Sequence, residues 1–200
     1  MSDAQTIASY DAIAAAYLAR RQDRTVMAGA LTRFVACTRP GGRVLDVGCG
    51  PGFDTAALRD QGLRAVGVDL SWRMLHTGRG VYGVPLVQAD LRWLPFAPVW
   101  DGLWVNAALL HLPRPEVPAV LRRFHHLLRP GGCLYLSLKA GQGEGWEEAA
   151  GYGRPAPRWF TYWTAEGLAA LLAGSGFAIL DEWRDELPQV TWLNCLARRP

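Results

Sequence analysis

A glycine-rich segment, DVGCGPG over residues 46–52, is the part of the sequence best suited to hold a ligand. Gly48, Gly50 and Gly52 alternate with other residues, so the backbone can turn tightly there and approach a bound molecule. The segment follows an apolar run and precedes a predicted helix, the setting in which such turns bind nucleotide-like cofactors. Asp46 stands at its base, where a carboxylate suits a ligand bearing an ammonium group better than a pyrophosphate. It could also cap backbone amides of the turn.

Two further carboxylates follow apolar runs later in the chain. Asp69 ends the run 65–69 and could accept hydrogen bonds from both hydroxyls of a ribose. Asp90 follows the run 85–88 and could accept a hydrogen bond from the exocyclic amine of an adenine. Because parallel strands end at one edge of a sheet, these groups predict a pocket for a cofactor that contains adenosine.

A nicotinamide-dependent oxidoreductase is an alternative, because its cofactor also binds at a glycine-rich turn. Its fingerprint, Gly-x-Gly-x-x-Gly or Ala, needs a small last residue. Counting from Gly48, that position falls on Phe53, which disfavours this alternative. A regulator that binds a nucleotide or a related cofactor without catalysis stays open.

His111 is the candidate catalytic residue, since it comes shortly after the predicted strand 101–106. The ordinary pKa of histidine suits a general base near neutral pH. The residue could equally shape a loop by binding a backbone carbonyl. Nearby aromatic residues could wall a substrate pocket or fill the core, namely Trp146, Trp159, Phe160, Tyr162 and Trp163.

The elements that must position these residues alternate between strands and helices. We expect helices over residues 4–21, 26–37, 54–61, 72–77, 115–128 and 164–172, with Ser71 and Thr164 as caps. Strands are expected over residues 43–47, 65–69, 85–88, 101–106, 133–139, 177–183 and 190–197. This alternation predicts an α/β fold with a parallel sheet covered on both faces, and the last two strands are close enough to be antiparallel. Residues 140–158 are expected to form a loop.

Four segments in order give the sequence a resemblance to a known family: VLDVGCGPG (44–52), VGVDLS (66–71), QADLRWLPF (88–96) and LLRPGG (127–132). They look like the ordered motifs of class I S-adenosylmethionine (SAM)-dependent methyltransferases, in the short subgroup of ubiquinone-biosynthesis-like and small-molecule enzymes. The resemblance runs from Tyr10 to about Phe177. It implies a Rossmann-like, seven-stranded, mostly parallel sheet with the last strand antiparallel, helices on both faces and an N-terminal helical lid.

The resemblance also implies roles for individual residues toward SAM and its product, S-adenosylhomocysteine (SAH). The three glycines would line the methionine part of SAM, and Asp69 would bind the ribose. Leu70 and Met74 would flank the adenine, while Asp90 and Leu91 would contact its edge. Asn106 would contribute a backbone contact. A helix carrying Tyr10, Tyr17 and Arg21 would close over the cofactor, although both tyrosines could be core residues.

The expected organisation is one methyltransferase domain over residues 1–200. It divides into a helical lid (1–40), a SAM-binding core (41–140), a substrate-side loop (141–163) and a C-terminal helix with strands (164–200). The expected partner is a small-molecule methyl acceptor, bound by a monomer or homodimer. A nucleic-acid acceptor is disfavoured, because Asn106-Ala107-Ala108 stands where an Asn-Pro-Pro-aromatic motif would be.

Composition and charge bear on the partner, the location and the state of the cysteines. A net charge of +3 with dispersed basic residues, including a single lysine at Lys139, argues against a nucleic-acid partner. No apolar run is long enough for a membrane span, and residues 1–21 do not read as a secretory signal, so we expect a cytoplasmic protein. The four cysteines form no metal-binding spacing and are expected to be reduced, namely Cys37, Cys49, Cys133 and Cys195.

Overall fold

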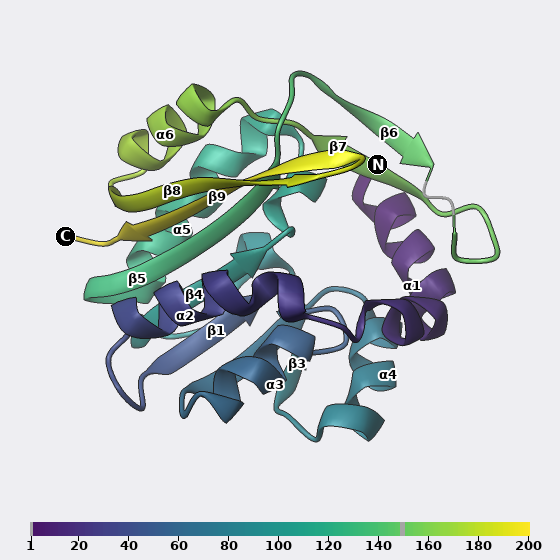
Figure 1. The fold of residues 1–200 in the computed structure, drawn as a ribbon, viewed down its shortest axis with the longest axis horizontal. Coiled ribbons are helices and arrows are strands. Elements are labelled where there is room, and N and C mark those ends of the chain that lie inside the picture. Colours follow the sequence, from purple (N-terminus) through teal and green to yellow (C-terminus); the bar gives the residue numbers. More distant parts are fainter. Residues whose placement is uncertain (1, 149–150) are drawn as a thin grey trace.

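The computed structural model describes residues 2–148 and 151–200, and a seven-stranded sheet forms its centre (Figure 1). The strand order is β3-β2-β1-β4-β5-β9-β8. The bounds are β1 Arg43–Val47, β2 Arg64–Asp69, β3 Leu86–Gln88, β4 Trp100–Asn106, β5 Leu128–Lys139, β8 Ala178–Leu187 and β9 Val190–Arg198. Strands β1 to β5 pair in parallel, whereas β9 is antiparallel to both β5 and β8. The predicted Rossmann-like sheet with an antiparallel last strand is confirmed.

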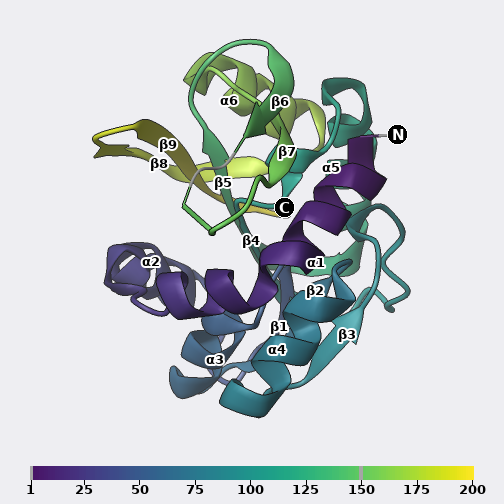
Figure 2. The ribbon, with the colours of Figure 1, turned by 90° about the vertical axis from the view of Figure 1, so that its right-hand side faces the viewer.

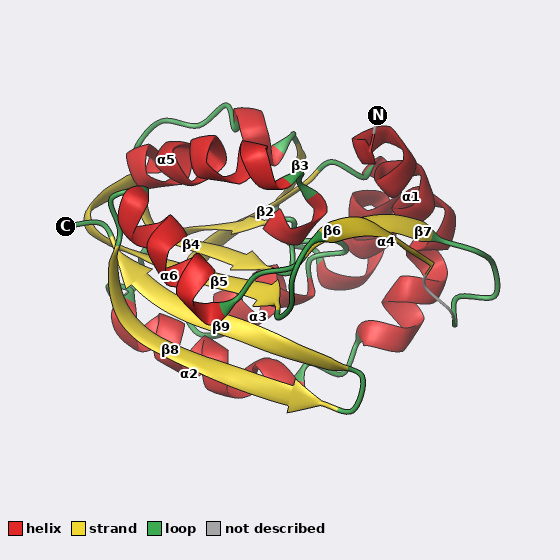
Figure 3. Cartoon of the chain, turned by 90° about the horizontal axis from the view of Figure 1, so that it is seen from above, coloured by secondary structure: helices red, strands yellow, loops and turns green. Residues whose placement is uncertain are grey.

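Helices cover both faces of the sheet (Figure 3). The longer ones are α1 Ser2–Arg21, α2 Ala28–Cys37, α3 Phe53–Asp60, α4 Trp72–Tyr82, α5 Val117–Leu127 and α6 Ala165–Gly174. Short 3₁₀ helices span η1 Thr25–Met27, η2 Leu91–Trp93, η3 Leu109–His111 and η4 Arg114–Glu116.

Alternate residues of the strands face opposite layers, as the two-residue period of a strand requires. Leu45 and Leu103 belong to the core cluster that includes residues of α5 and α6. Val44 and Trp104 belong to the cluster that includes residues of α2 and α3. Every central strand is therefore buried on both faces, which leaves the strand ends to form a site.

Both predicted helix caps are present. The hydroxyl of Ser71 accepts a hydrogen bond from the backbone N–H of Met74 at 3.2 Å, and the hydroxyl of Thr164 accepts one from Gly167 at 3.0 Å. Helix α4 nevertheless extends to Tyr82, five residues beyond the expected end at Thr77. A Cβ at Gly78 would overlap the backbone of Pro51, so this glycine lets α4 cross the glycine-rich turn at close range instead of ending the helix.

The expected loop over 140–158 contains a strand, which is a correction to the sequence-based prediction. Strand β6, Glu144–Glu148, pairs antiparallel with β7, Pro157–Thr161, in a separate two-stranded sheet. The prediction missed it because glycines and prolines dominate this stretch, and because the pairing joins residues on both sides of a long connection. Trp146 pairs with Trp159 there, so these aromatic side chains belong to a hairpin above the main sheet.

A disulfide joins Cys37 and Cys133, which corrects the expectation of four reduced thiols. The end of α2 lies against the middle of β5, and this brings the two Cα atoms to 6.2 Å. The bond links residues separated by 96 positions, so no short spacing between cysteines in the sequence indicates it. Cys49 and Cys195 are free and buried, as expected.

The N-terminal segment has two different roles. Helix α1 lies across the carboxyl-terminal side of the sheet, between β7 and α4 (Figure 2). Its residues Ile13 and Ala14 pack with Met74 and Ala156. Helix α2 instead buries Phe34 against the sheet face, so α1 and α2 occupy different positions on the sheet.

Within the described residues, no helix is long and apolar enough to cross a membrane. The same residues contain no group of acidic, histidine and cysteine side chains that could hold a metal ion.

Candidate functional site

A cavity of about 530 Å³ lies beneath α1, at the carboxyl ends of β1, β2 and β4. Its volume falls within the range of small-molecule sites, roughly 300–1,000 Å³. All but one of the predicted site residues line it: Tyr10, Tyr17, Arg21, Asp46, Gly48, Gly50, Asp69, Leu70, Met74, Asp90, Leu91, Asn106 and His111. The exception is Gly52.

The glycine-rich turn forms one wall of the cavity. Gly48 has a positive φ of 73°, and a Cβ there would overlap the side chain of Ala108. Gly50, with φ of 55°, donates its backbone N–H to Oδ2 of Asp69 at 2.8 Å. Gly52 also needs its positive φ, but it caps α3 and faces Leu86. Gly52 thus packs beside the cavity, and its expected contact with the ligand stays a prediction.

Asp69 ends β2 with its carboxylate beside the turn. It accepts one hydrogen bond from Gly50 and another from the backbone N–H of Ser71, both at 2.8 Å. Burial raises the pKa of Asp69, and the two backbone donors oppose that shift. A carboxylate has about four acceptor positions, so capacity remains for hydroxyl groups of a ligand in the cavity.

Asp46 is almost entirely buried and is satisfied from within the protein. The Thr55 hydroxyl donates to its Oδ2 at 2.6 Å. Burial, and then the nearby carboxylate of Asp54, raise its pKa well above the ordinary value. Asp46 thereby joins the end of β1 to α3 and lies at the cavity wall.

Asp54 and Arg24 form a network that the sequence did not reveal. Nε and Nη2 of Arg24 donate to the two carboxylate oxygens of Asp54 at 2.9 and 2.7 Å. Trp104 Nε1 and Asn106 Nδ2 each donate to Oδ2 of Asp54 at 2.9 Å. The Asn106 side chain is thereby fixed against Asp54 at the cavity wall. Only the position of Asp54, at the start of a helix after the turn, could have drawn attention to it.

The Asp90 carboxylate is engaged by Arg92, its neighbour in η2. The guanidinium donates from Nη2 to Oδ2 at 2.6 Å and from Nε at 3.0 Å, and the Arg92 backbone N–H donates to Oδ1 at 2.9 Å. Burial alone would raise the pKa of Asp90, but these hydrogen bonds lower it. Asp90 is thus an oriented, ionised acceptor at the cavity edge.

Aromatic side chains of α1 form the roof of the cavity. The rings of Tyr10 and Tyr17 meet edge to face with centroids 6.0 Å apart, and Tyr17 stacks on Tyr152 at 6.0 Å. Burial raises the pKa of both α1 tyrosines, so their hydroxyls stay protonated and can donate hydrogen bonds.

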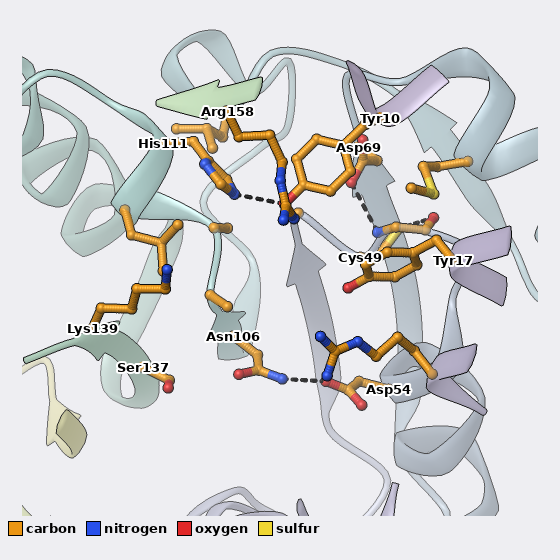
Figure 4. A pocket seen from close by; sticks show the side chains of 18 of the residues that line it. Tyr10, Tyr17, Cys49, Asp54, Asp69, Asn106, His111, Ser137, Lys139 and Arg158 are labelled. Atoms are coloured by element: carbon orange, nitrogen blue, oxygen red, sulfur yellow. Dashed lines mark hydrogen bonds between the residues drawn. The ribbon is translucent and has the colours of Figure 1, made fainter. Parts of the chain in front are cut away.

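His111 is held by hydrogen bonds at both ring nitrogens. Nδ1 lies 2.7 Å from the carbonyl oxygen of Trp159, and Nε2 lies 2.8 Å from the Tyr10 hydroxyl (Figure 4). A carbonyl only accepts, so Nδ1 carries the proton, and Nε2 accepts from Tyr10. Burial lowers the pKa of His111 to about 3, aided by the nearby charges of Arg158 and Lys139. The near-neutral pKa expected from the sequence is therefore corrected, because the ring is enclosed.

Two cations on the His111 side of the cavity were not predicted as site residues. Arg158 comes from β7 and donates from Nη1 to the Tyr10 hydroxyl at 3.2 Å. Lys139 comes from the end of β5, with Nζ 2.8 Å from Oε2 of Glu147. In Figure 4, Lys139 and His111 lie across the cavity from Asp69 and Tyr17. The position of Lys139 at the end of a predicted strand could have identified it as a site residue. Arg158 lay in the expected loop, where no pattern indicated a role.

The cavity thus has two chemically different ends. The end near the turn offers oriented carboxylates, which accept hydrogen bonds from hydroxyl and amino groups. The other end offers cationic and aromatic side chains around a neutral histidine. Such a site can bind a polar, hydroxyl-bearing molecule beside a second, smaller one.

The known proteins that this chain resembles are methyltransferases. A family model described as a methyltransferase domain matches residues 18–182. A trans-aconitate 2-methyltransferase from Azoarcus sp. (strain BH72) is 44% identical over 101 residues, covering 48% of this chain and 38% of that protein. Another, from Methylobacterium nodulans, is 38% identical over 128 residues, covering 62% of this chain and 48% of that protein. This chain therefore spans less than half the length of these curated relatives.

A solved structure resembles nearly the whole chain. It is the 1,6-didemethyltoxoflavin-N1-methyltransferase of Burkholderia thailandensis, with 1,6-didemethyltoxoflavin and SAH bound. The TM-score is 0.75 at 27% identity, and the match covers 96% of this chain and 87% of that one.

Proposed function

Because the chain belongs to the class I SAM-dependent methyltransferases, we propose that it transfers a methyl group from SAM to a small-molecule acceptor held in the cavity beneath α1. The observation that carries the proposal is the junction of the glycine-rich turn with the Asp69 carboxylate at one wall of that cavity. A nicotinamide-dependent oxidoreductase is disfavoured by the family match and by Phe53, which begins α3 where that fingerprint needs a small residue.

The residues present fit SAM. A side chain at Gly48 would collide with Ala108, so the turn keeps its backbone open to the cavity. Asp69 retains acceptor positions for the ribose hydroxyls, and Asp90 is oriented for the adenine edge. Leu70, Met74 and Leu91 supply apolar surface for the adenine ring, since all three line the cavity. When bound, SAM supplies an already activated methyl group, so the protein's work is positioning and exclusion of water.

We propose that Tyr10, Tyr17 and Arg21 cover the cofactor from α1. Tyr10 and Tyr17 meet the cavity from above, and Arg21 lines it near Tyr152. The roof supports water exclusion, which strengthens the polar contacts below it.

His111, the catalytic candidate, is proposed to be a positioning residue. Its one available lone pair, on Nε2, already accepts the Tyr10 hydrogen bond, and its lowered pKa makes it a weak base. By receiving that bond, His111 fixes the hydroxyl of Tyr10, which lines the same cavity. If the acceptor reaches the site ionised, the transfer needs no base.

Further expectations stay part of this proposal: a cytoplasmic location, a monomer or homodimer, and no nucleic-acid partner. The dispersed basic residues support the last of these. A disulfide is uncommon in cytoplasmic proteins, so the redox state of Cys37 and Cys133 in cells would test the location. Size-exclusion chromatography with light scattering would determine the oligomeric state.

Calorimetry tests the cofactor assignment. The protein should bind SAM and SAH, and it should show no comparable binding of NAD. Asp69→Asn should weaken SAH binding by about 1.5–3 kcal/mol, because a charge-assisted contact to the ribose is lost. Asp60→Asn removes the same charge at an exposed position in α3 and should leave binding unchanged. Binding of NAD without SAM would contradict the proposal, and SAH release with an acceptor would distinguish an enzyme from a regulator.

A further inference from the structure

Arg158 brings a guanidinium into the cavity that pairs with no carboxylate among the side chains that the structure describes. Its Nη1 donates to the neutral hydroxyl of Tyr10, and its Nε is buried without a hydrogen-bond partner. The remaining surroundings are aromatic, with the ring centroids of Tyr10 and Phe160 at 5.2 and 5.4 Å from the guanidinium carbon. A partly buried cation without a counter-ion costs free energy, which an arriving anion would recover.

Lys139 lies at the same end of the cavity. Its Nζ is 3.6 Å from the centroid of Phe160, the ring that Arg158 also approaches. Glu147 neutralises Lys139 through an ion pair of 2.8 Å, but the Glu147 side chain is 39% exposed whereas that of Lys139 is 16% exposed. The carboxylate partner is thus better solvated than the cation. With His111 neutral, the cluster of Arg158, Lys139 and Glu147 keeps an excess of about one positive charge. Asp185, a further carboxylate that lines the cavity, accepts a hydrogen bond from Nδ2 of Asn194 at 2.9 Å.

Apolar side chains surround these cations. Phe160 packs against the His111 ring at 4.9 Å between centroids, and Leu110, Leu112 and Trp192 also line the cavity. Such surroundings suit the carbon skeleton of a ligand, while only the cationic positions offer strong polar contacts.

We propose that this end is a carboxylate subsite, and that the methyl acceptor is a small carboxylic acid with an apolar body, bound as its anion through Arg158 and Lys139. The inference rests on the proposed function, because the other end of the cavity is assigned there to SAM. A carboxylate matches the charge excess of one and the donor geometry of a guanidinium, whereas a phosphate dianion would leave one negative charge uncompensated. An uncharged acceptor would leave Arg158 desolvated and unpaired.

Matched pairs of acid and amide probe the subsite without knowledge of the acceptor. Benzoate with benzamide, and 3-phenylpropionate with 3-phenylpropionamide, differ mainly in charge. Titrated calorimetrically into SAH-loaded protein, at least one acid should bind roughly tenfold to a hundredfold more tightly than its amide, the range expected for a charged hydrogen bond. Phenyl phosphate should bind more weakly than benzoate.

Substitutions test which residues cause the preference for the acid over its amide. In SAH-loaded protein, Arg158→Gln should remove most of the acid preference, and Lys139→Gln should reduce it. Arg158→Lys should retain part of it, because the charge stays. Arg122→Gln is the matched control, since it removes one positive charge at an exposed position of α5 away from the cavity, and it should change nothing. If Arg158→Gln does not fold, the test rests on Lys139→Gln, which must reduce the difference in affinity between acid and amide.

The outcomes separate the two proposals. If wild-type protein fails to bind SAH, the proposed function is contradicted. If SAH binds but no acid is preferred over its amide, or if phenyl phosphate binds as tightly as benzoate, the carboxylate subsite alone is wrong. An acid preference that survives Arg158→Gln would overturn the assignment as well.

Discussion

The state of His111 depends on its enclosure, since Nδ1 donates to Trp159 and Nε2 accepts from Tyr10. The protein thereby fixes one tautomer of a neutral ring and uses it to link η3, β7 and α1. A histidine after a strand therefore contributes order to the cavity roof. Its burial, which outweighs the opposing hydrogen bond to Trp159, gives it a pKa that would be poor for a base at neutral pH.

This pKa predicts how stability varies with pH. The folded-state pKa of about 3 lies below the ordinary value of 6.5, so as pH falls below 6.5 the unfolded chain takes up a proton that the folded ring refuses. The contribution of His111 is present above pH 6.5 and is lost as pH falls toward 3, at a slope of at most about 1.4 kcal/mol per pH unit. Urea unfolding at pH 7 and pH 5 should show a loss about 1–2 kcal/mol larger for wild type than for His111→Gln, which cannot titrate.

The same variant separates positioning from base catalysis. Glutamine can donate to Trp159 and accept from Tyr10, so a positioning role should largely survive the change. Loss of a general base should instead lower turnover about 10²–10⁴-fold, with the loss shrinking as pH rises. Equal pH dependence of stability in both proteins would contradict the buried neutral ring.

Gly48 fits its position because it has no side chain. Gly48→Ala combines a positive φ with overlap at Ala108, and we expect it to cost about 2–5 kcal/mol and to abolish SAH binding as the turn shifts. Gly62→Ala is the matched control, because Gly62 has φ of 81° but open space around it. It should cost about 1–2 kcal/mol and keep SAH binding. Chemical denaturation and calorimetry measure both, and equal effects would exclude the steric role of Gly48.

At the scale of elements, α1 is attached to its neighbours by few polar contacts. Asp11 accepts from the Ser71 hydroxyl at 2.5 Å and from the Arg73 backbone at 3.2 Å, which joins α1 to the start of α4. Ser9 donates to the carbonyl oxygen of Pro157, and Thr6 accepts from the Trp159 backbone, which joins α1 to β7. Together with the bonds of Tyr10 to His111 and Arg158, these attachments hold α1 at the roof of the cavity, and the proposed lid would have to break them to open.

Hydrogen exchange tests the lid. Added SAH should slow exchange in residues 4–21, because a cofactor beneath Tyr10 and Tyr17 adds contacts to α1. Asp11→Asn should speed exchange there several-fold, since a local opening cost of about 1 kcal/mol is lost with its hydrogen bonds. Asp60→Asn serves as the control. Equal protection with and without SAH would make α1 ordinary core.

At the scale of the whole molecule, the disulfide ties the N-terminal layer to the central sheet. Closing a loop of about 100 residues restricts the unfolded chain by up to about 4.7 kcal/mol, and typical measured gains are about 2–4 kcal/mol. The bond from Cys37 to Cys133 spans 96 positions, so it should be among the larger single contributions to stability.

Reduction should therefore lower the free energy of unfolding by about 2–5 kcal/mol. A Cys37→Ser, Cys133→Ser double variant should resemble the reduced protein and should no longer respond to reductant. Thiol titration of unfolded protein should detect two groups before reduction, Cys49 and Cys195, and all four cysteines afterwards. Four reactive thiols in unreduced protein would show that the bond is absent.

The sequence by itself determined the parts that depend on local patterns. Apolar runs and turn residues predicted all seven strands of the main sheet, and Ser71 and Thr164 marked helix starts because a cap acts within three residues. The positions of Asp69 and Asp90 after strands were enough to bring them to one edge, since parallel strands share an end.

Only the tertiary structure decided the features that join distant residues. The contact of Arg158 with Tyr10 spans 148 positions and that of Tyr10 with His111 spans 101, so no spacing could reveal them. The same holds for the disulfide and for the packing role of Gly52. Charge state followed this packing as well, because the pKa of His111 is set by burial and by neighbours that arrive only when the chain folds.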